Sequence, residues 1–237
     1  MSISGNTLYK SIIFDLDGTL MNTKSGIINC LACILEKNGL PPIEKAREMN
    51  FIGPPMRQAL KAEYGLSDDD AFSAAQEFRA LYADSYAMMA RTYPAMRLLL
   101  AALKEQGCKL SVATYKREDV AVKLLKHHKL DGFFDVIKGS DFEGKLTKRN
   151  IVENAINAVN VSAKNTVIIG DSTGDGRAAQ QVGADFIAVT YGFGFHNEKD
   201  FDGLTPVAVC NSVKDIFPAC YKVRKKRRAT LVPETAG

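Results

Sequence analysis

Residues 11–20, Ser-Ile-Ile-Phe-Asp-Leu-Asp-Gly-Thr-Leu, constrain the fold of this chain more than any other stretch. The apolar run Ile12–Phe14 is typical of a strand that is buried on both faces, as in the middle of a parallel sheet. The run stops at two acids, and Gly18 then lets the chain turn sharply. Asp15 and Asp17 are therefore expected at the carboxyl end of a central strand, where open α/β sheets bind ligands. A solvated turn is the alternative interpretation, because Asp and Gly also favour turns.

The rest of the chain predicts a mostly parallel sheet with helices on both faces and one long helical insertion. Apolar residues at helical spacing predict a first helix that ends near Asn38, and no strand signal returns before Thr92. Helices within this gap are expected at about residues 42–49, 54–64 and 67–89. Later strands are expected at about residues 109–113, 135–137, 166–169 and 185–189, separated by helices at about 117–127, 148–159 and 174–181. Such β-α repeats form a Rossmann-like, three-layer α/β/α core.

Four short polar motifs lie at or near the ends of the expected strands. They are Asp15–Leu20, Val112–Lys116, Gly139–Asp141 with Lys148, and Gly170–Asp175. In this order and at about this spacing they resemble the motifs of the haloacid dehalogenase superfamily of phosphatases and phosphotransferases. The branch that they resemble most is the phosphoglycolate-phosphatase-like one.

The resemblance implies a division of the chain into a core, a cap and a tail. Residues 1–20 and 93–221 would form the catalytic core, and residues 21–92 would form a helical cap inserted after the first strand. Residues 222–237 form a basic tail, which we expect to be disordered.

The family pattern also assigns roles to the paired acids. It makes Asp15 the nucleophile that forms an aspartyl phosphate, and Asp17 the acid that protonates the leaving oxygen and then, as a base, activates water. Side chains at i and i+2 on an extended chain point the same way, so both carboxylates are expected to face one crevice.

Magnesium is the cofactor that the resemblance implies. A carboxylate approaching a phosphate is repelled unless a cation lies between them, and a site built from oxygens favours Mg²⁺. The family pattern assigns the metal to the Asp15 carboxylate, the backbone carbonyl of Asp17, and Asp171. Asp171 also follows an apolar strand, which predicts a third acid at the same sheet edge. Asp175 is expected to orient the lysine or the metal's waters, or else to serve only as a first-turn acid of a helix.

Two further catalytic residues follow from the second and third motifs. Thr114 matches a hydroxyl that donates to a phosphate oxygen, although the neighbouring Tyr115 departs from the small or amide residue usual in relatives. The motif lysine is Lys148 rather than Lys145, because Lys148 opens an expected helix, whereas Lys145 lacks the proline that follows in Gly-Lys-Pro relatives. A positive charge there would neutralise the nucleophile and the phosphoryl oxygens.

Two other cations are candidates for substrate binding. Lys116 lies two residues after Thr114, and Arg57 lies in a part of the expected cap that faces the active site in relatives. The segment 191–195, rich in glycine and aromatic residues, follows the last expected strand and is expected either to line the substrate approach or to pack.

These features predict a magnesium-dependent phosphatase that hydrolyses a small soluble phosphomonoester. Phosphoglycolate is the first expected substrate, followed by a nucleoside 5′-monophosphate or a sugar phosphate. The alternatives are a β-phosphoglucomutase-like phosphomutase of the same superfamily and a non-catalytic binding protein that keeps the fold.

Composition bounds the partners and the location of the protein. Residues 222–237 contribute +5 to the net charge of +4, which leaves −1 on the body, so no nucleic-acid partner is expected. A further possibility is that the tail tethers the protein to an anionic partner.

No apolar run approaches the ~20 residues that span a bilayer, and the N-terminus lacks a signal-peptide pattern, so we expect a cytoplasmic protein without a membrane partner. Five dispersed cysteines fit a reducing compartment. The sequence leaves open whether the protein is a monomer or a dimer.

Overall fold

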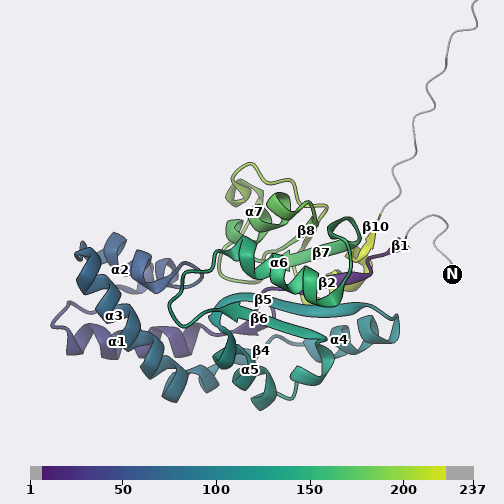
Figure 1. Ribbon diagram of the computed structural model, residues 1–237. Helices are drawn as coiled ribbons and strands as arrows, with labels where there is room; N and C mark the ends of the chain where they lie inside the picture. Colours follow the sequence, from purple (N-terminus) through teal and green to yellow (C-terminus); the bar gives the residue numbers. More distant parts are fainter. Residues whose placement is uncertain (1–6, 223–237) are drawn as a thin grey trace, which may run out of the picture.

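The computed structural model describes residues 7–222, and its centre is a six-stranded parallel sheet with the order β6-β5-β2-β7-β8-β9 (Figure 1). The strands are β2 (Ser11–Phe14), β5 (Lys109–Arg117), β6 (Val136–Ser140), β7 (Thr166–Gly170), β8 (Asp185–Val189) and β9 (Ala208–Cys210). The predicted α/β fold with a mostly parallel sheet is confirmed. The short strand β9 was not predicted.

Alternate residues of β2 face two different hydrophobic cores, as a strand buried on both faces requires. Ile12 and Phe14 pack with helices α4 (Met96–Glu105), α5 (Glu118–His127) and α8 (Ile216–Ala219). Ile13 faces the opposite side and packs with α6 (Lys148–Val159) and α7 (Thr173–Val182). Figure 1 shows α6 and α7 above the sheet, and α4 and α5 below it. All four β2 residues are buried.

A helical insertion, defined here as residues 23–90, supplies all the buried residues of a third hydrophobic cluster except Val120 of α5. Its helices are α1 (Lys24–Lys37), α2 (Met56–Tyr64) and α3 (Asp68–Leu81), with a 3-10 turn at Lys45–Phe51. They lie to the left of the sheet in Figure 1. The chain enters and leaves the insertion through β3 (Met21–Asn22) and β4 (Arg91–Thr92), which pair antiparallel.

Several element boundaries differ from the prediction. The helix expected over 67–89 ends at Leu81, where a π-helical turn (Tyr82–Tyr86) and a 3-10 turn (Ala87–Met89) follow. The helix expected over 42–49 is the 3-10 turn at 45–51. Strand β5 continues to Arg117, with a shift in its pairing to β6 after Ala113.

A two-stranded ribbon joins the ends of the described chain. Strand β1 (Thr7–Leu8) pairs antiparallel with β10 (Tyr221–Lys222). Lys222, which we assigned to the tail, therefore belongs to a strand. The remainder of the predicted tail, 223–237, lies outside the described residues.

The strand order places a ligand site at the end of β2. After β2 the chain passes to β5 and β6 on one side, and only later to β7, β8 and β9 on the other. The carboxyl ends of strands diverge at such a point, which leaves a crevice for ligands. Asp15 and Asp17 directly follow β2 at this crevice.

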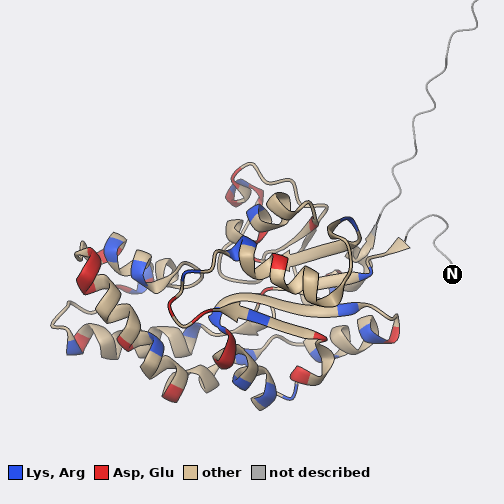
Figure 2. Ribbon diagram, in the orientation of Figure 1, with Lys and Arg blue, Asp and Glu red and all other residues tan. Residues whose placement is uncertain are grey.

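Charged residues of both signs are interspersed over the helices and strands (Figure 2). The weak net charge of the body is therefore spread over its elements rather than gathered on one of them. Among the described residues, no helix is long and apolar enough to span a membrane.

Substitution of Gly139 tests how closely β6 approaches β5. A Cβ at Gly139 would lie 2.5 Å from the Lys116 carbonyl oxygen and 2.6 Å from the Glu118 backbone. Because these backbone atoms cannot move without shifting the end of β5, Gly139→Ala should lower the free energy of unfolding by about 1–3 kcal/mol in a urea titration. Gly132→Ala is the control, since nothing lies within 4 Å of its added Cβ. Equal destabilisation by the two substitutions would contradict the tight approach.

Candidate active site

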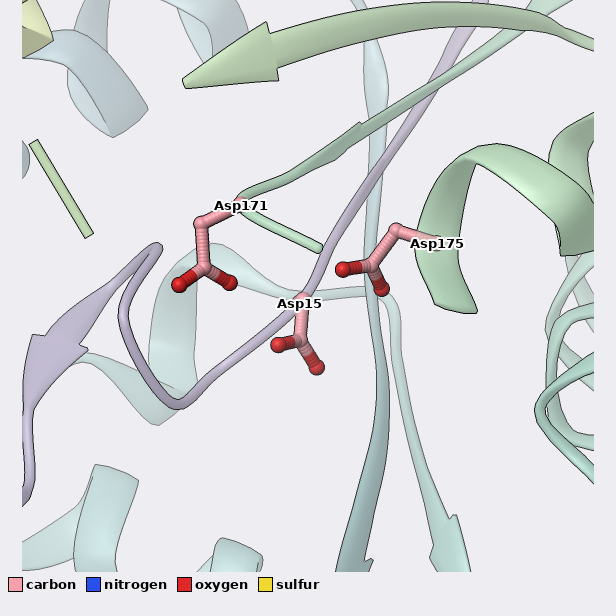
Figure 3. Close-up of side chains that lie close together, drawn as sticks. All are labelled: Asp15, Asp171 and Asp175. Atoms are coloured by element: carbon pink, nitrogen blue, oxygen red, sulfur yellow. The ribbon is translucent and has the colours of Figure 1, made fainter. Parts of the chain in front are cut away.

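Three buried carboxylates converge at the carboxyl edge of the sheet. Asp15 follows β2, Asp171 follows β7, and Asp175 lies in the first turn of α7. One oxygen of each lies within 4.8 Å of the others. Figure 3 shows the three side chains pointing toward one another from these elements. The sheet thus brings together residues that are 160 positions apart in the sequence.

The Lys148 side chain joins two of these acids. Its Nζ lies 2.6 Å from Asp15 Oδ1 and 2.7 Å from Asp175 Oδ1, and Lys148 itself is only 5% exposed. The lysine is the first residue of α6, whose start is fixed by a capping box between Thr147 and Asn150. The exposed Lys145 pairs instead with Glu143.

Tyr115 has a role that sequence reasoning missed. Its hydroxyl accepts a hydrogen bond of 3.0 Å from the backbone N–H of Lys148. This N–H is in the first turn of α6, where it has no partner within the helix. The residue that departs from the family pattern therefore helps to hold the start of the helix that carries the lysine.

Asp175 combines the two roles that the sequence left open. Its Oδ2 accepts hydrogen bonds from the backbone N–H and the hydroxyl of Ser172, at 3.2 and 2.6 Å. These bonds close a capping box at the start of α7. Its Oδ1 holds Lys148, so Asp175 is both a first-turn acid and a partner of the lysine.

Asp171 is held by the loop that follows β8. Its Oδ2 accepts backbone N–H bonds from Phe193, at 2.6 Å, and Gly194, at 3.2 Å. Gly18, with φ of 82°, lies against the same carboxylate, and a Cβ there would be 2.2 Å from Asp171 Oδ2. The segment 191–195 therefore positions an acid, a role that its sequence did not indicate because it depends on backbone groups.

Asp17 is paired with Lys116 rather than with the three-acid cluster. The Lys116 Nζ lies 3.1 Å from Asp17 Oδ1 and 3.1 Å from the hydroxyl of Tyr82. Thr114 lies within β5, not at its end as predicted, because the strand continues past it. The buried Thr114 hydroxyl accepts the Lys116 backbone N–H at 3.1 Å.

The structure does not bring Arg57 to these residues. Its guanidinium pairs with Asp68 on the surface of the helical insertion and lies 5.2 Å from the centre of the Phe72 ring. The expected substrate contact of Arg57 therefore has no support in the geometry. The neighbouring segment Gly53–Met56 does line the cavity described next.

A cavity of about 610 Å³ lies between the helical insertion and the carboxyl edge of the sheet. Its floor includes the acids Asp15, Asp17 and Asp171, together with Thr114 and Lys148. Its opposite wall is largely apolar and belongs to the insertion, with contributions from Phe51, Ile52, Met56, Phe78 and Tyr82.

Burial and the neighbouring carboxylates favour the protonated forms of Asp15 and Asp171 when no cation is present. Burial, opposed by Lys148, raises the pKa of Asp15. Burial and the nearby Asp175 raise the pKa of Asp171 to about 7. Burial alone would lower the pKa of Lys148, but Asp15 and Asp175 outweigh it and raise this pKa.

These carboxylates fit a hard divalent cation. Within residues 7–222, Oδ1 of Asp171 and Oδ2 of Asp15 accept no hydrogen bond from the protein, so each offers a free oxygen. Both oxygens of Asp175 already have partners. Three acids against one lysine also leave negative charge to be neutralised, and oxygen ligands suit Mg²⁺ or Ca²⁺.

Comparison with known proteins shows similarity along most of the chain. A family model described as haloacid dehalogenase-like hydrolase matches residues 12–189. A 5′-nucleotidase from Pseudomonas aeruginosa is 32% identical over 191 residues, which cover 80% of this chain and 86% of that protein. A phosphoglycolate phosphatase from Caulobacter vibrioides is 29% identical over 217 residues, covering 89% and 90%. The structure of a predicted phosphatase from Clostridium acetobutylicum, 30% identical, matches with a TM-score of 0.83 over 90% of this chain and 98% of that one.

The raised pKa of Asp171 predicts a pH-dependent stability of the metal-free protein. An acid whose folded pKa is near 7, against an ordinary 3.8, stabilises the fold fully below pH 4 and loses that contribution as the pH rises toward 7. Asp171→Asn removes the buried charge, while its amide oxygen can still accept the two N–H bonds. At pH 8 with a chelator, the variant should therefore be more stable than wild type, by on the order of 2 kcal/mol.

Thermal unfolding at pH 5 and pH 8 measures this difference. Asp69→Asn, in the exposed first turn of α3, is the control and should change stability by the same small amount at the two pH values. Added divalent cation should stabilise the wild type more than Asp171→Asn. The same stability of Asp171→Asn and wild type at pH 8 would contradict the assignment of a buried, destabilising charge.

Proposed function

This chain is a phosphatase that belongs to the haloacid dehalogenase-like hydrolases, and we propose that it hydrolyses a small phosphomonoester through an aspartyl phosphate, with Mg²⁺ as cofactor. The observation that carries the proposal is the buried Lys148 ammonium, which contacts Asp15 at 2.6 Å and Asp175 at 2.7 Å. A carboxylate fixed beside a buried cation at the end of a central strand suits attack on an anionic phosphorus centre.

In the first step, the Asp15 carboxylate would attack phosphorus as the bond to the leaving oxygen breaks. Asp17 would give its proton to that oxygen, so an alcohol leaves and the phosphoryl group stays on Asp15. Lys148 would stabilise the charge on the phosphoryl oxygens, and Thr114 would donate a hydrogen bond to one of them.

In the second step, Asp17 is a carboxylate and can act as a base. It would take a proton from water as the water oxygen attacks phosphorus and the bond to Asp15 breaks. Phosphate leaves, and both acids return to their starting forms.

Mg²⁺ would be held by the side chains of Asp15 and Asp171 and by the backbone carbonyl of Asp17. When bound, it would reduce the repulsion between the carboxylates and the phosphate. Asp175 would act on Lys148 rather than as a ligand, because both of its oxygens already have partners.

The helical insertion would be the cap over this site. In this proposal residues 21–92 form the cap, and residues 1–20 and 93–221 form the core. The hydrophobic cluster that the insertion builds almost entirely from its own residues, and the position of the insertion across the cavity, support this division.

The cavity favours a substrate larger than phosphoglycolate, the first expectation from the sequence. Its volume of about 610 Å³ lies within the ~300–1,000 Å³ of pockets that bury drug-sized ligands. Its apolar wall suits a leaving group with a flat apolar part. We therefore place a nucleoside 5′-monophosphate ahead of phosphoglycolate, in keeping with the 5′-nucleotidase relative. The five cysteines are free, which fits a reducing compartment, so we propose that the substrate is a metabolite of the cytoplasm.

A panel of phosphate esters tests the activity and the order of substrates. Release of phosphate should require Mg²⁺, stop with a chelator, and be faster from nucleoside 5′-monophosphates than from phosphoglycolate. Hexose 1-phosphates belong in the panel, because isomerisation that exceeds phosphate release would indicate a phosphomutase. No turnover of any ester would refute the proposal.

Substitution of the two acids separates their roles. Asp15→Asn should abolish turnover and leave the fold intact, because the amide has nearly the same shape but cannot form the aspartyl phosphate. Asp17→Asn keeps the nucleophile and should lower turnover by about 10²- to 10⁴-fold, the usual contribution of a general acid–base group. Steady-state rates with the best ester of the panel measure both effects. Wild-type turnover by Asp15→Asn would exclude covalent catalysis at this residue.

A further inference from the structure

The Lys116 side chain is buried and directed at the protein rather than into open cavity space. Only 7% of the side chain is exposed, although it borders the cavity. Its ammonium has three N–H bonds, and two protein groups already lie at 3.1 Å: Asp17 Oδ1 and the Tyr82 hydroxyl. The ammonium also lies 4.4 Å from the centre of the Tyr82 ring, within cation–π distance.

Tyr82 comes from the helical insertion, whereas Lys116 and Asp17 come from the core. It begins the π-helical turn that interrupts the expected helix, and such turns are frequent at functional sites. Its ring stacks on Phe78, with centroids 5.5 Å apart and planes 17° apart, and it is 5% exposed. Gly26 of α1 lets the turn approach closely, since a Cβ there would lie 2.4 Å from the Tyr86 carbonyl oxygen. The position of the Tyr82 hydroxyl is therefore set by packing within the insertion.

We propose that Lys116 is a positioning residue that holds the Asp17 carboxyl for proton donation to the leaving oxygen, and that Tyr82 holds Lys116 in place. This inference rests on the proposed function, in which Asp17 is the general acid. It replaces the substrate contact expected for Lys116 from the sequence. The insertion thereby contributes to proton transfer as well as to the wall of the cavity.

The contacts explain how this arrangement would act. The ammonium, 3.1 Å from Oδ1, fixes one oxygen of Asp17, a residue that lines the cavity. The Tyr82 hydroxyl occupies a second N–H of the ammonium and prevents Lys116 from turning toward a substrate oxygen.

Leaving-group dependence distinguishes positioning of the acid from binding of the substrate. A series of substituted phenyl phosphates, whose phenols differ in acidity, keeps the binding surface similar. An acidic phenol leaves without help, whereas a weakly acidic phenol needs the proton. Tyr82→Phe and Lys116→Met should therefore make the slope of log kcat/KM against phenol pKa steeper than in wild type.

The expected sizes follow from the total that a general acid contributes. Lys116→Met should lose about 10-fold in kcat/KM with the least acidic phenol and less than about 2-fold with the most acidic, a part of the ~10²–10⁴-fold effect of a general acid. Tyr82→Phe should show the same pattern with a smaller loss. Because Tyr82 acts through Lys116, adding Tyr82→Phe to Lys116→Met should change the slope no further.

Matched controls come from the same two parts of the molecule. Tyr64→Phe removes a hydroxyl of the insertion that donates to the Pro41 carbonyl, and Lys138→Met removes a lysine of β6 that pairs with Glu118. Neither should change the slope. A uniform loss across the series, or a rise in KM alone, in Tyr82→Phe and Lys116→Met would overturn the inference. Failure of the proposed function is separate, because the wild type would then hydrolyse none of the esters.

Discussion

The ammonium of Lys148 between Asp15 and Asp175 is the interaction on which the rest of the site depends. Four acids meet at this edge of the sheet, and in a low-dielectric interior they would repel one another strongly. Removing one partner of a buried ion pair typically costs about 3–5 kcal/mol, because a charge is left uncompensated. The protein fixes the lysine through its backbone as well as its side chain, with Tyr115 and the Thr147 capping box at the start of α6. The side chains of the site are therefore held in place at the ends of helices and strands, where backbone groups still need hydrogen-bond partners.

The same principle governs Asp171. Backbone N–H groups of the loop after β8 hold one of its oxygens, and glycines make the close approach possible on both sides. A Cβ at Gly192 would lie 2.5 Å from the Asp171 side chain, and one at Gly194 would lie 2.4 Å from the Asp171 carbonyl oxygen. For holding Asp171, the side chains of this loop thus matter less than the space left by the absence of a Cβ at its glycines.

The fold was largely predictable because its signals are local. The apolar run before Asp15 and the repeated β-α pattern predict a parallel sheet, and the motif acids fall at its carboxyl edge for the same reason. The contacts of Tyr82, Tyr115 and Phe193 were not predictable, because each depends on how two distant elements meet. The early end of α3 has the same origin, since the π-helical turn packs against Gly26 of α1, a contact that helical propensity does not describe. The position of Arg57 was not predictable either. Its place in the expected cap suggested a contact with substrate, but Asp68 at the start of α3 pairs with it at the surface of the insertion.

The pairing of β3 with β4 affects which parts of this chain can be replaced during evolution. Both chain connections to the insertion run side by side through this one short ribbon, so among the described residues the backbone passes between the core and the insertion at one place. The sheet requires only that β3 and β4 stay paired, whatever chain connects them. An insertion of different length or architecture can therefore replace residues 23–90 without altering the register of β2. The backbone of the insertion is in this sense exchangeable, but any replacement would also have to supply the contact that Tyr82 makes with Lys116.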